Sequence, residues 1–309
     1  MRIVFFGTPE FAVPSLEALL GEGFDVLAVV TQPDRPQGRS RSQLVPSPVK
    51  RAAEAEDLPV LQPERPNERA FVEQLRALAP APDVGVVVAY GHILKPELLA
   101  IPARGMVNVH ASLLPELRGP APVPWAIING LATTGVTIMQ MDAGMDTGPV
   151  LHRLPHHIDP AVTGGELAEH LAEMGAQALV ETLTLLEQDG LTAQPQDNAR
   201  ATYAPKLTRE AARIRWTEPA DTVARLIRAL DPKPAAWTEL DGQEIKLFGA
   251  RPANGQGTPG DVLTADGRLL IAAGIGVVEV EEIQPAGKSR MPVADWIRGR
   301  GVKAGRRFA

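Results

Sequence analysis

Two polar residues stand at the end of an otherwise apolar run, where the sequence reads "GMVNVH" and continues "ASLLPELRGPAP". Asn108 and His110 are two positions apart, and residues two apart in a β-strand project from the same face of a sheet. An amide can donate a hydrogen bond to a developing oxyanion, and an imidazole can donate, accept or move a proton near neutral pH. The spacing therefore predicts a site that stabilises negative charge on an oxygen atom.

Two carboxylates follow in the glycine-rich stretch "MDAGMDTGPVL". Either Asp142 or Asp146, placed beside His110, would fix the tautomer of the imidazole and favour its protonated form. An amide, an imidazole and a carboxylate together suit attack on a carbonyl carbon. Structural alternatives stay open, because Asn108 could satisfy backbone groups, His110 could be a hydrogen-bonded core residue, and both aspartates could form turns.

Covalent and metal-dependent mechanisms find little support in the sequence. The chain has no cysteine and no G-x-S-x-G elbow, and Ser112 precedes Leu-Leu-Pro, which fits a structural role. The neighbours His156 and His157 lack the i,i+4 spacing of a helical metal site. We assign four histidines to the surface: His152, His156, His157 and His170. Direct transfer between two bound substrates, without a metal, is the expected chemistry.

The elements that must position these side chains alternate between strands and helices. Apolar runs typical of buried strands are followed by segments with helical spacing, and this alternation is typical of a parallel sheet covered on both faces. We predict a Rossmann-like, doubly wound α/β domain, which binds ligands beyond the carboxyl ends of its strands. The expected strands are 2–6, 25–31, 83–90, 105–110, 135–142 and 149–158, and the expected helices are 11–20, 49–56, 68–79, 123–129 and 165–188.

The second half of the chain predicts a different architecture. Thr163 and Glu166 have the spacing of a capping box at the start of the last predicted helix. Beyond it, periodicity is lost and then replaced by short strands with Gly and Asp-Gly turns, which favour a small, OB-like β-barrel. The expected organisation is a first domain over 1–189, a linker over 190–206 and a C-terminal domain over 207–309.

The turn after the first strand reads "GTPEFAVP" and lacks a phosphate-binding pattern. A dinucleotide-binding enzyme would need G-x-G-x-x-G at this place, and a P-loop enzyme would need G-x-x-x-x-G-K-[ST]. Neither pattern occurs in the chain. A dehydrogenase and an NTPase are both disfavoured on this ground.

Charge is distributed unevenly along a chain whose net charge is -6. Residues 1–205 hold 14 Lys and Arg against 24 Asp and Glu, whereas residues 206–309 hold 17 against 13. The basic C-terminal part favours a polyanionic partner, although a solvated surface with a basic tail would give the same counts. No apolar run approaches the roughly 18 residues that span a membrane, and the run after Met1-Arg2 is too short for a secretory signal. We expect a cytoplasmic protein.

Several segments of the sequence together form a long motif that is specific for one protein family. Asn108-x-His110, "SLLPELRGPAP" and "TGVTIMQMDAGMDTGPVL" resemble the folate-dependent formyltransferases. Within that family, "FFGTPEFAVPSLEALL", "VTQPDRPQGR" and "PSPVK" are similar to the members that formylate aminoacylated initiator tRNA. The resemblance covers essentially all of residues 1–205, and the β-rich remainder is compatible with the C-terminal barrel of those members.

This resemblance implies transfer of a formyl group from 10-formyltetrahydrofolate to the α-amine of methionine on initiator tRNA. Asn108 and His110 would bind the oxyanion, His110 would also move protons, and Asp146 would hold His110 in its working state. The folate donor would lie against two segments and one carboxylate: Val88, Ala89, Tyr90, Gly91 and Ile93; Ser112, Leu113, Leu114 and Pro115; and Asp142.

The loop "PDRPQGRSRSQLVPSPVK" over residues 33–50 is long for a connection between a strand and a helix. The resemblance implies that this loop meets the acceptor end of tRNA, with Arg39 matching a family arginine; a solvated loop is the alternative. The expected tRNA-binding residues are Arg35, Arg39, Arg41, Lys50 and Lys206.

The sequence departs from the family pattern at Leu117, where an aromatic residue is common, and at Pro120, which replaces a small residue. Both flank the site and bear on the packing of substrates. An amino sugar or another small amine is the alternative acceptor, but a small acceptor needs neither the basic loop nor a basic C-terminal domain. A non-catalytic RNA-binding module would have no use for Asn108, His110 and Asp146. We expect a monomer.

Overall fold

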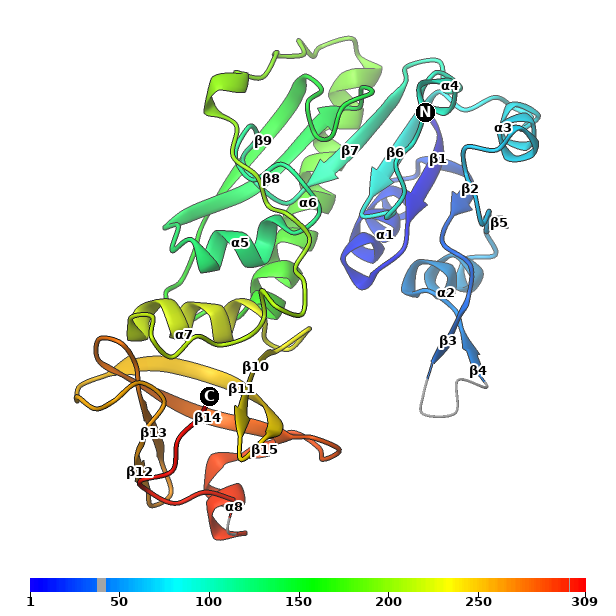
Figure 1. The fold of residues 1–309 in the computed structure, drawn as a ribbon. Helices are drawn as coiled ribbons and strands as arrows, with labels where there is room; N and C mark the ends of the chain where they lie inside the picture. The colour runs from blue at the N-terminus through cyan, green and yellow to red at the C-terminus, as the bar shows by residue number, and fades with distance from the viewer. Residues whose placement is uncertain (38–42, 300) are drawn as a thin grey trace. The chain divides into compact units, whose positions relative to one another are not determined.

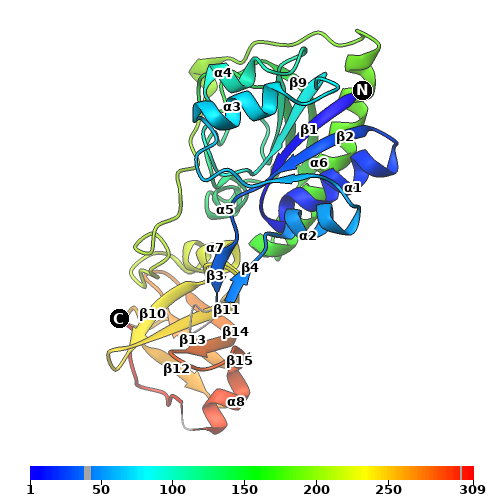
Figure 2. The same ribbon diagram turned by 90° about the vertical axis from the view of Figure 1, so that its right-hand side faces the viewer.

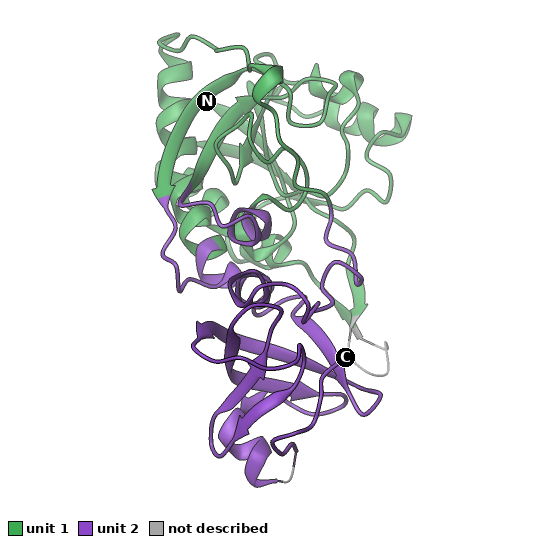
Figure 3. Cartoon of the chain, turned by 60° about the vertical axis from the view of Figure 1, so that its left-hand side comes forward, with its two compact units in different colours: residues 1–122, 134–156, 168–205 green, residues 123–133, 157–167, 206–309 purple. Residues whose placement is uncertain are grey.

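The computed structural model describes residues 1–37, 43–299 and 301–309. These residues form two compact units (Figure 3). Unit 1 comprises residues 1–122, 134–156 and 168–205, and unit 2 comprises residues 123–133, 157–167 and 206–309. The second unit therefore takes two short segments from the first 167 residues in addition to the C-terminal part.

The seven-stranded sheet of unit 1 has the strand order β5-β2-β1-β6-β7-β8-β9 (Figure 1). Neighbouring strands pair in parallel from β5 to β7, and β8 runs antiparallel to β7. The prediction of a Rossmann-like, mostly parallel sheet is confirmed. The strands are β1 Arg2–Gly7, β2 Asp25–Val30, β5 Val60–Leu61, β6 Val84–Val88, β7 Met106–His110, β8 Thr133–Gln140 and β9 Val150–His157.

Helices cover both faces of this sheet, which explains why β6 is buried along its whole length. On one face, Phe6 and Met106 belong to an apolar cluster that includes residues of α3 Arg69–Arg76 and α4 Pro96–Leu99. On the other face, Val109 packs against α6 Gly164–Glu187. The approach is close, because a Cβ added to Gly175 would lie 2.8 Å from Val109 Cγ1.

The start of α6 has the capping box that the sequence predicts. The Glu166 side chain accepts from the backbone N–H of Thr163 at 2.9 Å, and the Thr163 hydroxyl accepts from the backbone N–H of Glu166 at 3.3 Å. Two backbone donors that would otherwise lack partners are satisfied in this way.

The basic loop after β2 contains a short hairpin, β3 Arg35–Gln37 and β4 Gln43–Val45, which pair antiparallel (Figure 2). The helix that follows, α2 Pro48–Ala55, begins after Ser47, whose hydroxyl accepts from the backbone N–H of Lys50 at 3.0 Å. The sequence predicts only a loop before α2, because strands of three residues carry too little alternation to be recognised. The other elements of unit 1 are η1 Glu10–Ala12, α1 Val13–Gly21 and η2 Asn198–Arg200.

Unit 2 contains an antiparallel sheet of order β10-β11-β14-β13-β12, with β15 paired to β14. The final residues bridge both edges of this sheet, because Phe308 pairs with Leu240 and Arg307 pairs with Asp261. This pairing gives the sheet the closure expected of a barrel. The elements are α5 Pro122–Ile128, α7 Ala220–Ala229, β10 Ala236–Leu240, β11 Gln243–Ala253, β12 Val262–Ala265, β13 Leu269–Ala272, β14 Val277–Pro285, β15 Met291–Pro292 and α8 Val293–Arg298.

Across the part of the chain that the structure describes, no helix is both long enough and apolar enough to span a membrane.

Candidate active site

Asn108 and His110 lie on one face of β7, as the two-residue spacing predicts. Asn108 pairs with Val87 of β6, and His110 pairs with Thr137 of β8. Val109, between them, points to the opposite face and packs against α6. The polar face of β7 therefore looks away from α6 and ends at the carboxyl edge of the parallel strands, where such sheets bind ligands.

His110 is buried, with 6% of its side chain exposed, and both ring nitrogens face oxygen atoms. Nε2 lies 3.0 Å from the carbonyl oxygen of Leu117. A carbonyl oxygen only accepts hydrogen bonds, so Nε2 carries the hydrogen and donates it. Nδ1 lies 3.8 Å from Asp146 Oδ2. The protein thereby selects both the ring orientation and the tautomer.

Asp146 reaches this site from the loop between β8 and β9. Its backbone is in the left-handed region, with φ +55°, and its Oδ2 also accepts from the backbone N–H of Gly119 at 2.8 Å. Only 17% of the side chain is exposed. The carboxylate therefore joins His110 to the loop that follows β7.

Asp142, four residues earlier, has different surroundings. It is exposed, and its Oδ1 accepts from the backbone N–H of Gly144 at 2.9 Å and from the hydroxyl of Thr147 at 2.7 Å. These contacts shape its own loop. Of the two aspartates that the sequence leaves open as partners of His110, the structure brings Asp146 to the ring.

The carboxamide of Asn108 is half-buried and makes no hydrogen bond to any residue that the structure describes. Because an amide presents two N–H donors, this side chain is free to donate to a substrate oxygen. It lies on the same strand face as His110, so the two donors can converge on one atom.

The segment from Ser112 to Pro115 is held by Glu116 and by the strands β8 and β9, because Thr137 donates to the carbonyl of Ser112 and Arg153 donates to that of Leu114. The Ser112 hydroxyl donates to the carbonyl of Glu116 at 2.5 Å, and the backbone N–H of Leu114 donates to Thr137 Oγ1 at 3.0 Å. Ser112, Leu114 and Pro115 are buried, and Leu113 is partly exposed. The serine hydroxyl is engaged by the carbonyl of Glu116, in keeping with a structural role.

The loop after β6 begins at Val88 and turns through two positive φ angles, +47° at Ala89 and +85° at Gly91. Glycine is favoured at position 91 because its φ is in the left-handed region, and a Cβ there would also displace Gln32 Nε2, which lies 2.5 Å away. Gln32 Nε2 in turn donates to the carbonyl of Tyr90 at 3.0 Å. Ile93 is 74% exposed. The loop is thus fixed at its base and open at its tip.

Tyr90 is the buried residue of this loop. Burial raises the pKa of its phenol to about 12, and its hydroxyl oxygen has no hydrogen-bond partner among the described residues. His92, two residues further on and half-buried, lines an open pocket of about 520 Å³ together with Pro33, Arg35, Pro36 and Glu64. The cavity adjoins both the loop after β6 and the base of the β3–β4 hairpin.

The predicted tRNA-binding residues have varied surroundings. Arg35 is exposed and donates to Gln32 Oε1 at 2.7 Å. Lys50 is 17% exposed, and its Nζ lies 2.7 Å from Asp34 Oδ2. Lys206 is exposed. Arg39 and Arg41 lie outside the described residues.

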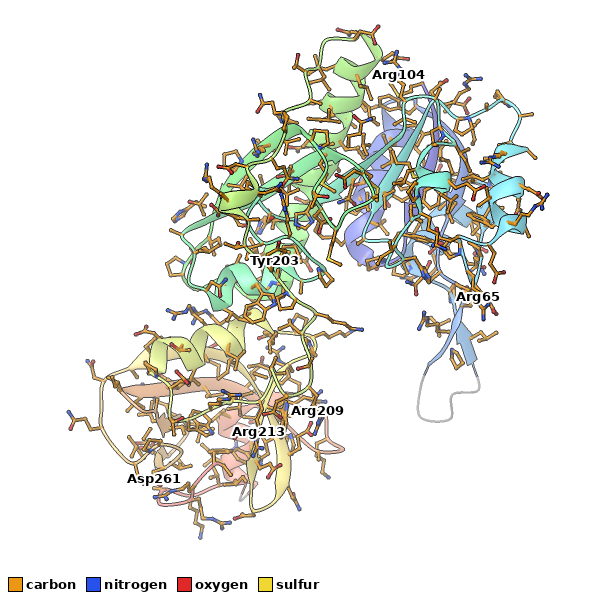
Figure 4. All side chains as sticks on the ribbon, turned by 45° about the horizontal axis from the view of Figure 1, so that its top comes forward. Arg65, Arg104, Tyr203, Arg209, Arg213 and Asp261 are labelled. Carbon is orange, nitrogen blue, oxygen red and sulfur yellow. The ribbon has the colours of Figure 1, made fainter. Side chains whose placement is uncertain are left out.

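Unit 2 adds basic residues that the sequence does not single out. Arg209 and Arg213 both lie over the ring of Trp237, with their Cζ atoms 4.5 and 5.2 Å from its centroid (Figure 4). Among the residues that the structure describes, no group of three or more His, Asp or Glu side chains is placed to hold a metal ion.

Residues of the segment 194–204 also surround the site. Sequence spacing does not reveal them. Thr202 Oγ1 accepts from the backbone N–H of Leu117 at 2.8 Å, and Ala204 N–H donates to the carbonyl of Arg118 at 2.8 Å. A Cβ on Gly119, whose φ is +119°, would lie 2.7 Å from the Ala204 carbonyl oxygen. The segment is therefore packed along the loop that binds His110, while Tyr203 remains 68% exposed (Figure 4).

Leu117, one of the two departures from the family pattern, lies at the centre of these contacts. It is buried, its φ is +57°, and its carbonyl accepts from His110. Pro120, the other departure, is exposed.

Two family models match the chain. Residues 1–183 match the model described as "Formyl transferase", and residues 206–301 match "Formyl transferase, C-terminal domain". A methionyl-tRNA formyltransferase from Magnetococcus marinus is 47% identical over 309 residues, which cover 99% of this chain and 98% of that protein. A methionyl-tRNA formyltransferase from Pelobacter propionicus is 48% identical over 298 residues, which cover 96% of this chain and 92% of that protein.

Solved structures show the same fold at lower identity. HypX from Aquifex aeolicus in complex with tetrahydrofolic acid is 20% identical with a TM-score of 0.67, and the match covers 96% of this chain and 46% of HypX. An N-formyltransferase from Helicobacter canadensis, in complex with folinic acid and dTDP-3-aminofucose, is 18% identical with a TM-score of 0.70, and the match covers 92% of this chain and 99% of that one. From the matched families and the near full-length relatives together, we conclude that the chain belongs to the formyl transferase family and is a formyl-transferring enzyme.

Proposed function

We propose that the enzyme transfers a formyl group from 10-formyltetrahydrofolate to the α-amine of methionine on initiator tRNA. The observation that carries the choice of acceptor is the extent of the match. Proteins named methionyl-tRNA formyltransferase are 43 to 48% identical over nearly the whole chain, whereas the N-formyltransferase of Helicobacter canadensis, in complex with dTDP-3-aminofucose, is 18% identical.

The loops beside the site suit a reduced pterin as the formyl donor. Ala89 and Gly91 are exposed, and so is the apolar side chain of Ile93. The β8–β9 loop adds a second exposed apolar residue, Met145, which is 58% exposed. Apolar walls with a few backbone hydrogen-bonding groups suit a flat, amide-bearing ring. The residues that would hold the donor are therefore 88–93 and 112–115, with Asp142 supporting the opposite loop.

The chemistry follows from the groups on the polar face of β7. The neutral α-amine attacks the formyl carbon, a C–N bond forms, and the formyl oxygen becomes negatively charged. The free amide of Asn108 donates to this oxygen. Preorganised donors of this kind are among the largest contributions to acyl transfer, at about 3 to 4 kcal/mol each.

Proton movement completes the transfer. The attacking nitrogen loses a proton, the bond from the carbon to N10 of the folate breaks, and N10 gains a proton. His110 is the titratable group placed to move this proton, with Asp146 Oδ2 opposite its Nδ1. Nε2–H of His110 donates to the carbonyl of Leu117. When the formyl oxygen of the substrate takes the place of this carbonyl, the same N–H donates to the formyl oxygen. The products are the formylated amine and tetrahydrofolate, and no covalent enzyme intermediate is required.

The decisive experiment supplies methionyl-tRNA and 10-formyltetrahydrofolate and weighs the aminoacyl product. The expected result is an added mass of one formyl group, dependent on both substrates. A parallel reaction replaces the tRNA with a nucleotide-linked amino sugar. Formylation of the sugar at a higher kcat/KM than that of methionyl-tRNA would overturn the proposed acceptor while leaving the formyl transfer itself intact.

A further inference from the structure

Gln196 lies between the loop that carries Asp146 and the loop that follows β7. Its Nε2 donates to the carbonyl oxygen of Asp146 at 2.9 Å and to that of Gly148 at 2.7 Å. A side-chain amide has two hydrogens on nitrogen, so both are used on the β8–β9 loop. Gln196 therefore binds the backbone of Asp146, while the carboxylate of Asp146 remains directed to His110.

The other end of Gln196 is anchored on a buried cation. Its Oε1 accepts from Arg118 Nε at 3.1 Å and from Arg118 Nη2 at 2.7 Å. Arginine only donates and backbone carbonyls only accept, so the orientation of the amide is fixed by its partners. A glutamine with both donors and its acceptor engaged has one orientation, and it holds the two loops at a fixed separation.

Arg118 is suited to this role because it is 3% exposed and its hydrogen-bond acceptors are neutral amides. Besides Gln196 Oε1, its Nη2 donates to Asn198 Oδ1 at 2.8 Å. A buried guanidinium needs its donors satisfied, which binds the residue tightly to the segment 194–204. Its neighbours in sequence are the two residues that contact the site: Leu117 accepts from His110, and Gly119 donates to Asp146.

Asp146 needs such support. Asp146 has φ +55°, in the left-handed region, which a residue with a Cβ enters only infrequently even when it is an aspartate. The loop around it also contains Gly148, where a Cβ would collide with the carbonyl oxygen of Gln140, so the backbone path of this loop is closely defined. The two donors of Gln196 hold the carbonyl groups of Asp146 and Gly148 directly. Their loss would let this backbone relax and would lengthen the 3.8 Å between Oδ2 and Nδ1.

We propose that Gln196 is a positioning residue for catalysis: through its side-chain amide, the anchored Arg118 holds the backbone of Asp146 so that the carboxylate stays opposite His110. This proposal rests on the proposed function, in which His110 and Asp146 take part in formyl transfer. It places a determinant of the reaction in the segment between the two predicted domains, outside the motifs that carry the chemistry.

The substitution Gln196→Glu tests the proposal, because glutamate keeps the oxygen acceptors for Arg118 and loses both N–H donors. The carboxylate would face two carbonyl oxygens and repel them. We expect kcat to fall about 10- to 100-fold, as for other groups that orient a catalytic residue, with KM for both substrates within about twofold. The matched control is Gln194→Glu, the same change two residues earlier in an exposed side chain without a hydrogen bond among the described residues.

A double-mutant comparison distinguishes positioning from general damage. If Gln196 acts through Asp146, then adding Gln196→Glu to Asp146→Asn changes kcat by less than about twofold. Independent, multiplying effects in the double variant, or wild-type kcat in Gln196→Glu, would overturn the proposal. Gln196→Met, which lacks both donors and acceptor, gives the same comparison if the glutamate variant does not fold.

A measurement without turnover separates this proposal from the proposed function. In ring-labelled protein, the ¹⁵N resonances of His110 report the hydrogen bonding of each nitrogen. We expect Gln196→Glu to move the Nδ1 signal in the same direction as Asp146→Asn, and Gln194→Glu to leave it in place. An unmoved signal refutes the positioning role even in an active enzyme. A moved signal in a protein that does not formylate methionyl-tRNA supports that role and removes only the proposed acceptor.

Discussion

At the scale of single residues, backbone conformation decides which of two aspartates, Asp142 or Asp146, contacts His110. Period-two spacing suffices to place Asn108 and His110 on one face of a strand. It does not choose between two aspartates four positions apart in a loop. That choice depends on the left-handed backbone of Asp146 and on the contacts of Asp142 with its own loop, neither of which has a sequence period. The hydrogen bonds between Arg118 and Gln196, which are 78 positions apart, likewise have no sequence period by which they could be predicted.

Replacing Asp146 with Asn should lower kcat about 100-fold or more, because the amide cannot supply the negative charge opposite Nδ1. Asp142→Asn is the matched control: it keeps an Oδ1 acceptor for its loop, so kcat should stay within about threefold. A contact of Asp142 with the donor would appear as a higher KM for folate. Steady-state kinetics on both variants checks this, and the reverse ranking of kcat would make Asp142 the partner.

His110→Gln separates the ring from its structural contact. A glutamine amide can still donate to the carbonyl of Leu117, so the variant should fold, with an unfolding midpoint close to that of the wild type. It cannot move a proton, and we expect kcat to fall by about 10²- to 10⁴-fold. Formyl transfer and thermal unfolding are measured side by side. Turnover near the wild-type rate would exclude His110 from the mechanism.

Among the elements, those with a strong period or a cap were predictable. The continuous apolar run of β6 and the Thr163–Glu166 capping box both appear as the sequence predicts. The strand β10, Ala236–Leu240, gives little local signal, because "AWTEL" has no clean alternation and its place is set by pairing with β11 and with the last residues of the chain. Elements defined by distant partners leave little trace in local sequence.

The barrel strand β14 carries a charge whose effect on stability can be predicted. Glu279 is 10% exposed and accepts from Arg268 Nε at 2.7 Å and from Arg251 Nε at 3.1 Å. Hydrogen bonds from Arg268, and then from Arg251, lower the pKa of Glu279 from 4.5 to about 2. Because the folded protein favours the charged form, this contribution is present above pH 4.5 and is lost as the pH falls towards 2.

Glu279→Gln should therefore lower the free energy of unfolding at pH 7 by about 1 to 2 kcal/mol, and the difference from the wild type should shrink as the pH falls from 4.5 towards 2. Urea unfolding followed by tryptophan fluorescence measures it, because all four tryptophans belong to unit 2. Glu281→Gln, on the same strand with 58% exposure, is the control and should change little. A difference that does not vary with pH would contradict the assignment.

The uneven charge of the whole molecule bears on the proposed RNA substrate. Residues 206–309 carry 17 Lys and Arg against 13 Asp and Glu, while the preceding residues are acidic overall. Local basic patches should therefore attract a polyanion, although the net charge of the whole chain is -6 and repels it. Sequence counts predict this distribution, but they do not place a basic side chain on a surface: Lys50 is paired with Asp34, and Trp237 is flanked by Arg209 and Arg213.

Affinity for tRNA should fall as salt rises, with a slope of log affinity against log salt of about -0.7 to -0.9 for each phosphate contact. Lys206→Ala should make this slope shallower by about 1. Lys95→Ala, an exposed lysine beside α4 in the acidic part of the chain, should leave it unchanged. Filter binding of methionyl-tRNA over a salt series gives the slopes. Equal slopes for the wild type and Lys206→Ala would remove that lysine from the interface.

The segment 194–204 also constrains how a gene of this kind could be rearranged in evolution. Because this stretch pairs with Val150 and with Arg118, a recombination event that exchanged the C-terminal module would preserve the contacts of the loop after β7 only if its crossover fell after Ala204. A crossover at residue 190, where the helical pattern stops, would combine a segment 194–204 from one protein with the site loops of another. In natural chimaeras of such proteins, we therefore expect the breakpoints to lie after the position of Ala204.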